Sequence, residues 1–174
     1  MMRKNETPEC LARDASRGNE ESFVALCDHM KTKLFRAAKG VLGDETLALD
    51  AVSEAVFRAF KGIKRLREPK HAETWFVRIL LNVANDMRRR RKHEILTEAP
   101  PEAPHYDRHD ELEFAQMIES LPPDLREVVS LKYFSGYTLR EIAEILRVPE
   151  GTAKSRLSRA LRSLRLLHME DMDG

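Results

Sequence analysis

The sequence predicts an all-α protein built from two small helical domains that a flexible, acidic linker joins. Alternating apolar and polar residues of the kind that form strands are scarce, whereas apolar residues recur at helical spacing through most of the 174 residues. A proline-containing acidic stretch interrupts this pattern and has too few apolar residues for a core. We therefore expect a first domain over residues 1–93, a linker over 94–110 and a second domain over 111–174.

The overall charge excludes a uniformly basic protein. Lys and Arg number 30 against 29 Asp and Glu, which gives a net charge of +1. Any affinity for nucleic acid must therefore come from cations that are segregated on particular surfaces. The N-terminus lacks the apolar core of a signal peptide, and no apolar run reaches the length of a membrane span. We expect a cytoplasmic protein that does not insert into a membrane by itself.

The two cysteines indicate a reducing compartment rather than a disulfide-stabilised fold. Cys27 and His29 are conceivable metal ligands, but no second pair at ligand spacing completes a site. Cys27 also falls on an apolar stripe, which favours core packing. Since the chain has no recognisable arrangement of nucleophile, base and metal, we expect no cofactor, no metal and no catalytic residues.

Two long helices are predicted at the start of the first domain. The first spans Glu20 to about Leu42, and Gly43 and Asp44 end it and cap its successor. The side chains of the successor that we expect to face inward are Ala48, Val52, Ala55, Val56, Ala59, Phe60 and Ile63. Phe57 differs because it lies among charged side chains, and a large aromatic residue in such surroundings favours a protein contact. An isolated exposed apolar residue is the alternative.

A basic connection and a third helix complete this domain. The connection runs from Lys61 to His71 and the helix from about Glu73 to Lys92, where five consecutive cations close it. The outer stripe of the helix is Trp75, Arg78, Asn82, Asn85, Asp86 and Arg89. This stripe combines a ring that can stack on bases, amides that can pair with base edges and cations that can bind phosphates. The combination favours binding of single-stranded nucleic acid. A stable helix end with solvated arginines is the alternative.

The composition changes after residue 93. Prolines and a run of acidic residues over 94–110 are typical of a semi-stiff linker. Beyond it we expect one short helix from Leu112 to Ser120 and another that begins at Pro123 and ends near Gly136.

Residues 137–164 read as a helix-turn-helix. Thr138 and Glu141 form a capping box at the start of the first helix. The buried stripe expected on this helix is Leu139, Ile142, Ala143 and Leu146, and that on the second helix is Ala153, Leu157, Ala160, Leu161 and Leu164. The second helix carries no acid between Gly151 and His168, so it suits the major groove of DNA. Short helix pairs with a basic face also occur as solvated packing units, which is the alternative.

From Gly18 onward the sequence resembles the extracytoplasmic-function (ECF, group 4) sigma factors, the two-domain minimal form of the sigma-70 family of bacterial RNA polymerase. Residues 50–60, DAVSEAVFRAF, are similar to region 2.2, the helix that docks on the clamp helices of the β′ subunit. Residues 73–92 look like regions 2.3 and 2.4, which open and read the -10 promoter element. Residues 121–164 look like region 4, and VPEGTAKSRLSRAL matches the helix that reads the -35 element.

The resemblance implies a transcription initiation factor that binds core RNA polymerase and directs it to promoters. The implied polymerase-binding residues, which face the β′ clamp helices, are Asp50, Ser53, Glu54, Phe57 and Arg58. The implied -10 residues are Lys64, Arg65, Arg67, Lys70, His71, Trp75, Arg78, Asn82, Asn85, Asp86 and Arg89. The implied -35 residues are Lys154, Ser155, Arg156, Ser158, Arg159 and Arg162. The family also implies contact with the β flap and control by an anti-sigma factor.

The sequence departs from the family pattern at two positions. Ser53 stands where the polymerase-binding helix usually has glutamine, and Ala153 replaces the usual valine. The main alternative to a sigma factor is a stand-alone helix-turn-helix regulator that binds duplex DNA as a dimer. That alternative explains residues 137–164 but leaves the N-terminal half without a role.

Overall fold

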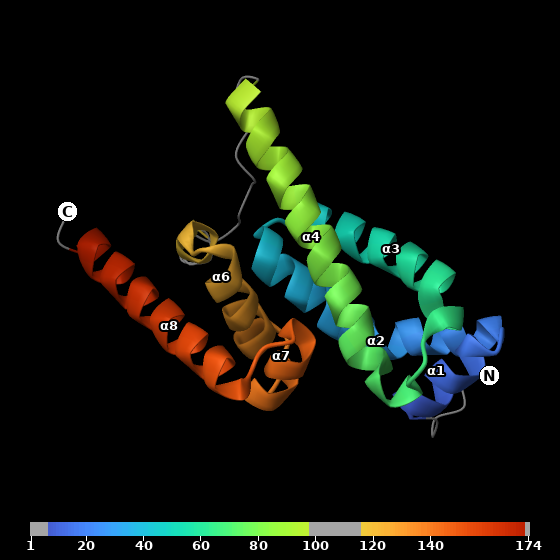
Figure 1. The fold of residues 1–174 in the computed structure, drawn as a ribbon. Helices are drawn as coiled ribbons and strands as arrows, with labels where there is room; N and C mark the ends of the chain where they lie inside the picture. The colour runs from blue at the N-terminus through green and yellow to red at the C-terminus, as the bar shows by residue number, and fades with distance from the viewer. Residues whose placement is uncertain (1–6, 98–115, 173–174) are drawn as a thin grey trace.

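Every element in the described part of the chain is helical (Figure 1). The computed structural model describes residues 7–97 and 116–172. The predicted flexible linker lies mainly outside these residues. No described helix combines the length and the apolarity that crossing a bilayer requires.

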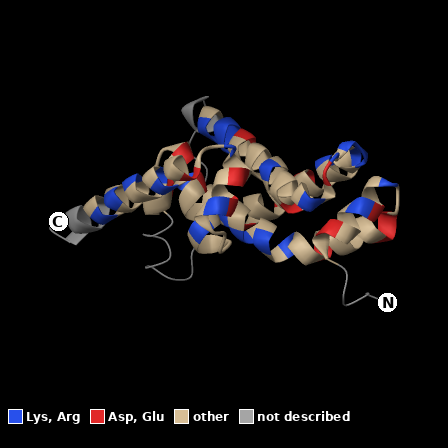
Figure 2. Ribbon diagram, turned by 60° about the horizontal axis from the view of Figure 1, so that its bottom comes forward, with Lys and Arg blue, Asp and Glu red and all other residues tan. Residues whose placement is uncertain are grey.

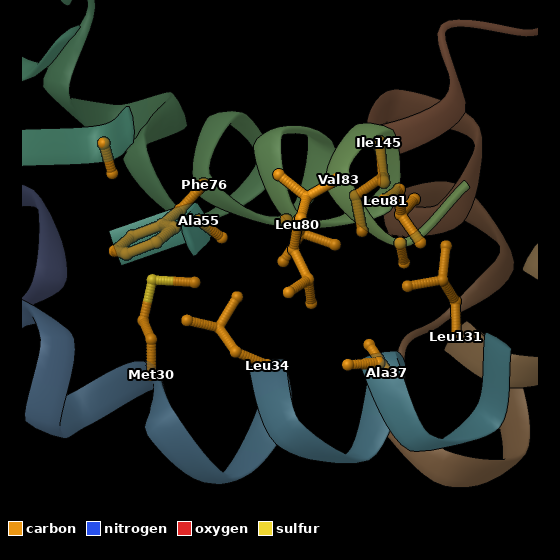
Figure 3. Close-up of a cluster of buried hydrophobic side chains, with 14 of the residues drawn as sticks. Met30, Leu34, Ala37, Ala55, Phe76, Leu80, Leu81, Val83, Leu131 and Ile145 are labelled. Atoms are coloured by element: carbon orange, nitrogen blue, oxygen red, sulfur yellow. The ribbon is translucent and has the colours of Figure 1, made fainter. Parts of the chain in front are cut away.

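Four helices and two short 3-10 turns form the first domain. They are α1 (Pro8–Ser16), α2 (Glu20–Leu42), α3 (Glu45–Gly62), η1 (Ile63–Arg65), η2 (Pro69–His71) and α4 (Ala72–Thr97). The helices α2, α3 and α4 pack on one another around Met30, Leu34, Phe76 and Leu80, all of which are fully buried (Figure 3). This three-helix core fixes the positions of the charged outer faces of α3 and α4.

The predicted bounds of α2 are confirmed, because both of its ends carry specific caps. The side chain of Asn19 accepts a hydrogen bond from the backbone N–H of Ser22 at 2.9 Å. Gly43 ends the helix in the left-handed conformation, with φ of 70°, which a residue with a side chain rarely adopts. Asp44 then caps α3 by accepting from the backbone N–H of Leu47 at 2.8 Å.

The sequence analysis assigned no helix to residues 8–16, where the structure has α1. The hydroxyl of Thr7 caps α1 by accepting from the backbone N–H of Cys10, and Pro8 occupies the first helical turn. A threonine cap followed by proline is a known helix start, so this signal was present in the sequence. The helix packs Leu11 and Ala12 against the rest of the first domain, including η1 and η2.

The second domain contains α6 (Pro123–Val129), the π-helix η3 (Ser130–Phe134), α7 (Leu139–Leu146) and α8 (Glu150–Met172). The predicted capping box of α7 is confirmed: the Thr138 hydroxyl accepts from the Glu141 backbone N–H at 3.3 Å, and the Glu141 carboxylate accepts from the Thr138 backbone N–H at 2.7 Å. Arg147 ends α7 with φ of 55°, a left-handed conformation that the sequence did not reveal.

Three expectations about burial and helix ends are wrong. Helix α4 continues to Thr97, because no proline interrupts the chain before residue 100. Phe60 is 47% exposed, since it lies at the end of α3, where one edge of its ring contacts Phe23. Leu161 is 39% exposed because α8 packs on α6 and α7 along a narrower arc than the apolar pattern suggests.

The two domains share one apolar core. Leu131 and Ile145 of the second domain lie in the same cluster as Ala37 of α2 and Leu81 of α4 (Figure 3). Ile145 was absent from the predicted stripe of α7, because that stripe describes packing within the helix-turn-helix alone. Its full burial shows that α7 uses a second face, which contacts α4 of the first domain.

Replacing Thr138 by alanine should lower the free energy of unfolding by about 1 kcal/mol, because α7 loses a helix cap. The backbone N–H of Thr138, which the substitution keeps, and the Thr138 hydroxyl, which it removes, both donate to the Glu141 carboxylate and hold its pKa below the ordinary value. Stability from that carboxylate is present above the ordinary pKa of glutamate and is lost as the pH falls through the lowered pKa. The loss of unfolding free energy in T138A, measured by urea unfolding, should therefore become smaller in acid.

Thr46→Ala, on the exposed first turn of α3, is the matched control and should change stability by less than about 0.5 kcal/mol. An equal effect of the two substitutions would contradict the capping role.

Candidate nucleic-acid and polymerase interfaces

Lysine and arginine residues recur along α8 (Figure 2). Several of these cations are exposed, together with serine hydroxyls. The predicted groove-facing residues that are exposed are Lys154, Ser155, Ser158, Arg159 and Arg162. Arg156 differs, because it is half-buried and its guanidinium lies 3.4 Å from a carboxylate oxygen of Asp124 on α6. The opposite face buries Ala153 and Ala160, whose small side chains let α8 lie close to the rest of the helix-turn-helix. The geometry leaves the cationic face free to enter a major groove.

The connection between α3 and α4 presents a second group of cations. Lys64, Arg65 and Arg67 are all exposed. Lys70 and His71 are also exposed, and each lies within 3.4 Å of the Glu68 carboxylate. The hydrogen bond from Lys70 lowers the pKa of Glu68, so this acid stays ionised between the two bases.

Trp75 is held beside this connection in a half-buried position. Its ring lies over Gly62, where an added Cβ would approach a ring carbon to 3.2 Å. The edge of the ring also faces Phe76, with 6.2 Å between the ring centroids. A ring fixed in this way, next to exposed cations, can stack on an unpaired base without first being ordered.

The predicted outer stripe of α4 separates into two parts. Asn82 is exposed, and Asp86 forms an ion pair with the exposed Arg89. Arg78 and Asn85 instead face the second domain. The Arg78 guanidinium donates to the backbone carbonyls of Ile145 at 2.9 Å and Glu144 at 2.8 Å. The structure therefore does not present these six side chains on one free face.

Asn85 contacts a half-buried acid of α6. Its side-chain amide donates to a carboxylate oxygen of Glu127 at 2.5 Å. Burial raises the pKa of Glu127, while the hydrogen bond from Asn85 and the charge of Arg156 oppose that rise. Arg88, one turn beyond Asn85, donates to the backbone carbonyl of Glu119 at 3.1 Å. These contacts place one stripe of α4 inside the molecule rather than on its surface.

Four of the five predicted polymerase-binding residues, all except Phe57, line one wall of a groove of about 560 Å³ between α3 and α4. Residues from α3 in this wall are Asp50, Ser53, Glu54 and Arg58, and the facing residues of α4 are Val83, Asp86, Met87 and Arg90. Glu54 and Arg58 form an ion pair at 2.7 Å, while the Ser53 hydroxyl donates to the Leu49 carbonyl of its own helix. Asp86, predicted to belong to the -10 set, thus lies on the same groove as the predicted polymerase set.

Phe57 is 52% exposed, and the ammonium of Lys61 lies 4.1 Å from the centre of its ring. The sequence analysis missed Leu49, which is 54% exposed two helical turns before Phe57. The eight-residue spacing of these two apolar side chains was the available signal. Together they give the outer face of α3 more exposed apolar surface than the sequence analysis assigned to it.

Nothing in residues 7–97 and 116–172 groups His, Cys, Asp or Glu side chains in a way that would hold a metal ion. Cys27, considered as a ligand from sequence, is half-buried in α2, and burial raises the pKa of its thiol to about 11. The thiol is therefore protonated at neutral pH, whereas metal binding requires the thiolate.

Comparison with known proteins finds two family models that match separate parts of the chain. The family model Sigma-70 region 2 matches residues 26–94, and Sigma-70, region 4 matches residues 111–164. The match to region 2 accounts for the N-terminal half, which a stand-alone helix-turn-helix regulator leaves unexplained.

Several curated sigma factors are similar over most of their length. The chain is 31% identical over 137 residues to the RNA polymerase sigma-E factor of Streptomyces coelicolor, covering 76% of this chain and 77% of that protein. It is 29% identical over 154 residues to RNA polymerase sigma factor SigV of Bacillus subtilis, covering 86% and 92%. It is 28% identical over 172 residues to the ECF sigma factor SigW of the same organism, covering 88% and 92%.

The fold also has a solved counterpart. CnrH, in a structure with the cytosolic domain of CnrY, superposes with a TM-score of 0.78 at 24% identity, covering 95% of this chain and 99% of that one. This likeness supports the helical architecture, and the sequence relatives supply the family. The chain belongs to the sigma-70 family and is an ECF sigma factor, a transcription initiation factor of RNA polymerase.

Proposed function

We propose that the two domains read the two elements of a promoter while the outer face of α3 binds core RNA polymerase. The observation that carries this proposal is the presence of two separate cationic surfaces, one on each domain. The α8 face has the shape for duplex DNA, and the connection beside Trp75 has the chemistry for unpaired bases.

The upstream contact is assigned to α8. Its exposed lysine and arginine side chains bind phosphates and the edges of guanine, while its hydroxyls reach neighbouring groups in the groove. Arg159 lies at the centre of this face and has no acidic partner among the described residues. Arg156 joins the contact only by exchanging its ion pair with Asp124 for DNA.

The downstream contact is assigned to the α3–α4 connection and the start of α4. Lys64, Arg65, Arg67 and Lys70 would neutralise the phosphates of the unpaired strand. Trp75 would stack on a base, and the exposed amide of Asn82 would pair with a base edge.

We assign the binding of core polymerase to the outer face of α3. Phe57 supplies a large apolar contact, and the Glu54–Arg58 ion pair beside it presents both charges to the partner. The short side chain of Ser53 is turned back to its own helix and adds little there. We assign the partner surface to the β′ clamp helices, and we expect the second domain to contact the β flap.

We extend the proposal to the domain boundaries, to catalysis and to the location of the protein in the cell. The boundaries 1–93, 94–110 and 111–174 describe the two units and their linker, and α4 runs past residue 93 to Thr97. The chain carries out no catalysis of its own, since RNA synthesis is the chemistry of the polymerase. It acts in the cytoplasm, where polymerase and promoter DNA are found.

An anti-sigma factor is the proposed regulator. RpoE of Bartonella quintana, which shares this fold with a TM-score of 0.63, has been solved in complex with the anti-sigma factor NepR, and CnrH has been solved in complex with the cytosolic domain of CnrY. Copurification of the chain from its native host with polymerase subunits alone would count against such a partner.

Charge reversal at Arg159 tests the upstream assignment in reconstituted transcription. With core polymerase and a promoter mapped from the transcripts that overexpression induces, Arg159→Glu should lower run-off product by a factor that corresponds to about 1 to 3 kcal/mol for a lost base contact. Arg36→Glu, on the exposed side of α2, is the matched control and should leave the product unchanged. Equal yields of run-off product from the two variants would contradict the assignment of the upstream contact to α8. No promoter-specific transcript from the unmodified chain would contradict the function as a whole.

Truncation of Phe57 tests the polymerase assignment. An aromatic side chain at the centre of a protein interface contributes about 2 kcal/mol or more, so Phe57→Ala should weaken the Kd for core polymerase by about 30-fold. Val24→Ala removes an apolar side chain that is 60% exposed on α2 and serves as the control. Fluorescence anisotropy of the labelled chain measures both, and unchanged affinity in F57A would place the polymerase elsewhere.

A further inference from the structure

We propose that a pocket at the end of α3 binds a second unpaired base of the promoter strand, besides the base assigned to Trp75. The pocket lies between the α1–α2 turn and the end of α3, and Phe60 lines it. The inference rests on the proposed function, because it adds a base site to the connection that we assign to the -10 element. Of the residues that line the pocket, only Lys64 belongs to the predicted -10 set.

The pocket has a size that suits a single nucleobase. Its volume is about 220 Å³, below the roughly 300–1,000 Å³ of pockets that hold drug-sized ligands. Two aromatic rings, an amide, a carboxylate and two ammonium groups belong to the residues that line it. These residues are Asn19, Glu20, Phe23, Phe60, Lys61 and Lys64.

Phe60 supplies the ring that an incoming base can reach. It was expected to face inward, but it is 47% exposed. One edge of its ring contacts Phe23, with 5.3 Å between the ring centroids, and Phe23 is only 6% exposed. The buried ring therefore holds the Phe60 ring in place while part of Phe60 stays open to the pocket. Such a ring can stack on any base, because every base has a π-face.

A row of aromatic rings connects this pocket with Trp75. Phe23 stacks on Phe76 with 6.5 Å between the centroids, and the ring of Phe76 lies 6.2 Å from that of Trp75. Phe23 and Phe76, in the middle of the row, are buried, whereas Phe60 and Trp75, at its two ends, are partly exposed. The core of the first domain thus fixes two base-stacking rings relative to each other.

Cations join the pocket to the surface that we assign to the unpaired strand. Lys61 and Lys64 line the pocket and are exposed, and Lys64 is also the first cation of the connection between α3 and α4. A strand that passes from Trp75 to Phe60 would therefore keep its phosphates beside ammonium groups.

Two polar residues of the pocket suit the edge of a base. The side-chain oxygen of Asn19 caps α2, which leaves its amide N–H groups able to donate to a base. The Glu20 carboxylate can accept a hydrogen bond from the amino group of a base, whereas it repels a phosphate. The arrangement therefore favours a base inside the pocket and the phosphates at the two lysines.

Helix α1 and the turn after it form one wall of the pocket. They contribute Ala15, Gly18 and Asn19, and α1 also contacts η1 and η2 of the connection. Figure 1 shows α1 beside the segment that joins α3 to α4. Residues 8–19 precede residues 26–94, which the region 2 model matches, so this wall lies outside the match.

Photocrosslinking tests the proposal in the complex of the full chain with core polymerase and a promoter whose -10 region is premelted. 5-Iodouracil, which crosslinks to aromatic side chains on irradiation, replaces one unpaired base at a time in each strand, and mass spectrometry identifies the crosslinked residue. We expect one position to crosslink to Trp75 and a different position of the same strand to crosslink to Phe60. The unmodified chain is used, so this result does not depend on the folding of a variant.

Substitution of Phe60 provides a second measurement. Phe60→Ala should weaken the affinity of the same complex for the premelted promoter about fivefold or more, as loss of one base–aromatic stack requires. Phe60→Trp keeps a stacking ring and should retain the affinity. Tyr133→Ala removes a ring that is 56% exposed on the π-helix η3 and is the matched control, for which we expect no change.

Two results would overturn the inference and leave the proposed function standing. One is crosslinking to Trp75 with none to Phe60 at any position. The other is a lower affinity of F60A for core polymerase in the absence of DNA, because Phe60 would then belong to the polymerase-binding face with Phe57. Absence of crosslinks to both Trp75 and Phe60 would contradict the downstream assignment of the proposed function as well.

Discussion

Close approach of α2 to the π-helix at Gly40 determines how the two halves of the molecule meet. Any side chain at this position would collide with Ser130, which is fully buried. Glycine within a helix costs about 1 kcal/mol relative to alanine, and the packing of the π-helix offsets this cost. With α2 and the π-helix in contact, α7 lies against α4 and its last carbonyls come within reach of Arg78. The shared apolar core and the polar contacts along α4 both depend on this approach.

The contact between the two domains leaves some of the candidate functional surfaces exposed and covers part of another. The α8 face and the outer face of α3, which we propose for duplex DNA and for polymerase, are exposed while α7 lies against α4. The face of α4 that we propose for unpaired bases is divided: Asn82 is exposed, whereas Arg78 and Asn85 are engaged with the second domain. An unpaired strand becomes available only after a promoter has been engaged and opened. A chain that exposes its base-reading groups late has less opportunity to bind single-stranded nucleic acid elsewhere.

The sequence predicted those features that depend on neighbours along the chain. The ends of α2 followed from Asn19 and Gly43, and the capping box of α7 followed from Thr138 and Glu141, because caps are local hydrogen bonds. The cationic face of α8 followed from helical spacing. Sequence patterns of this kind did not predict the features that depend on contacts with the other domain. Ile145 lies outside the apolar stripe of α7 but is buried against α4, and the stripe of α4 gives no sign that Arg78 and Asn85 would find partners 67 and 42 residues away.

The distance between the two domains, measured before and after promoter opening, shows whether α7 still lies against α4 when the promoter is read. Fluorophores attached to cysteines introduced at Thr32 and Tyr133, both exposed, report this separation by single-molecule energy transfer once the two native cysteines are replaced by serine. We expect high transfer in the free chain and lower transfer in the open complex with core polymerase and promoter DNA. Unchanged transfer in a complex that synthesises transcript would contradict it, because the -10 strand would then be read with Arg78 and Asn85 still bound to the second domain.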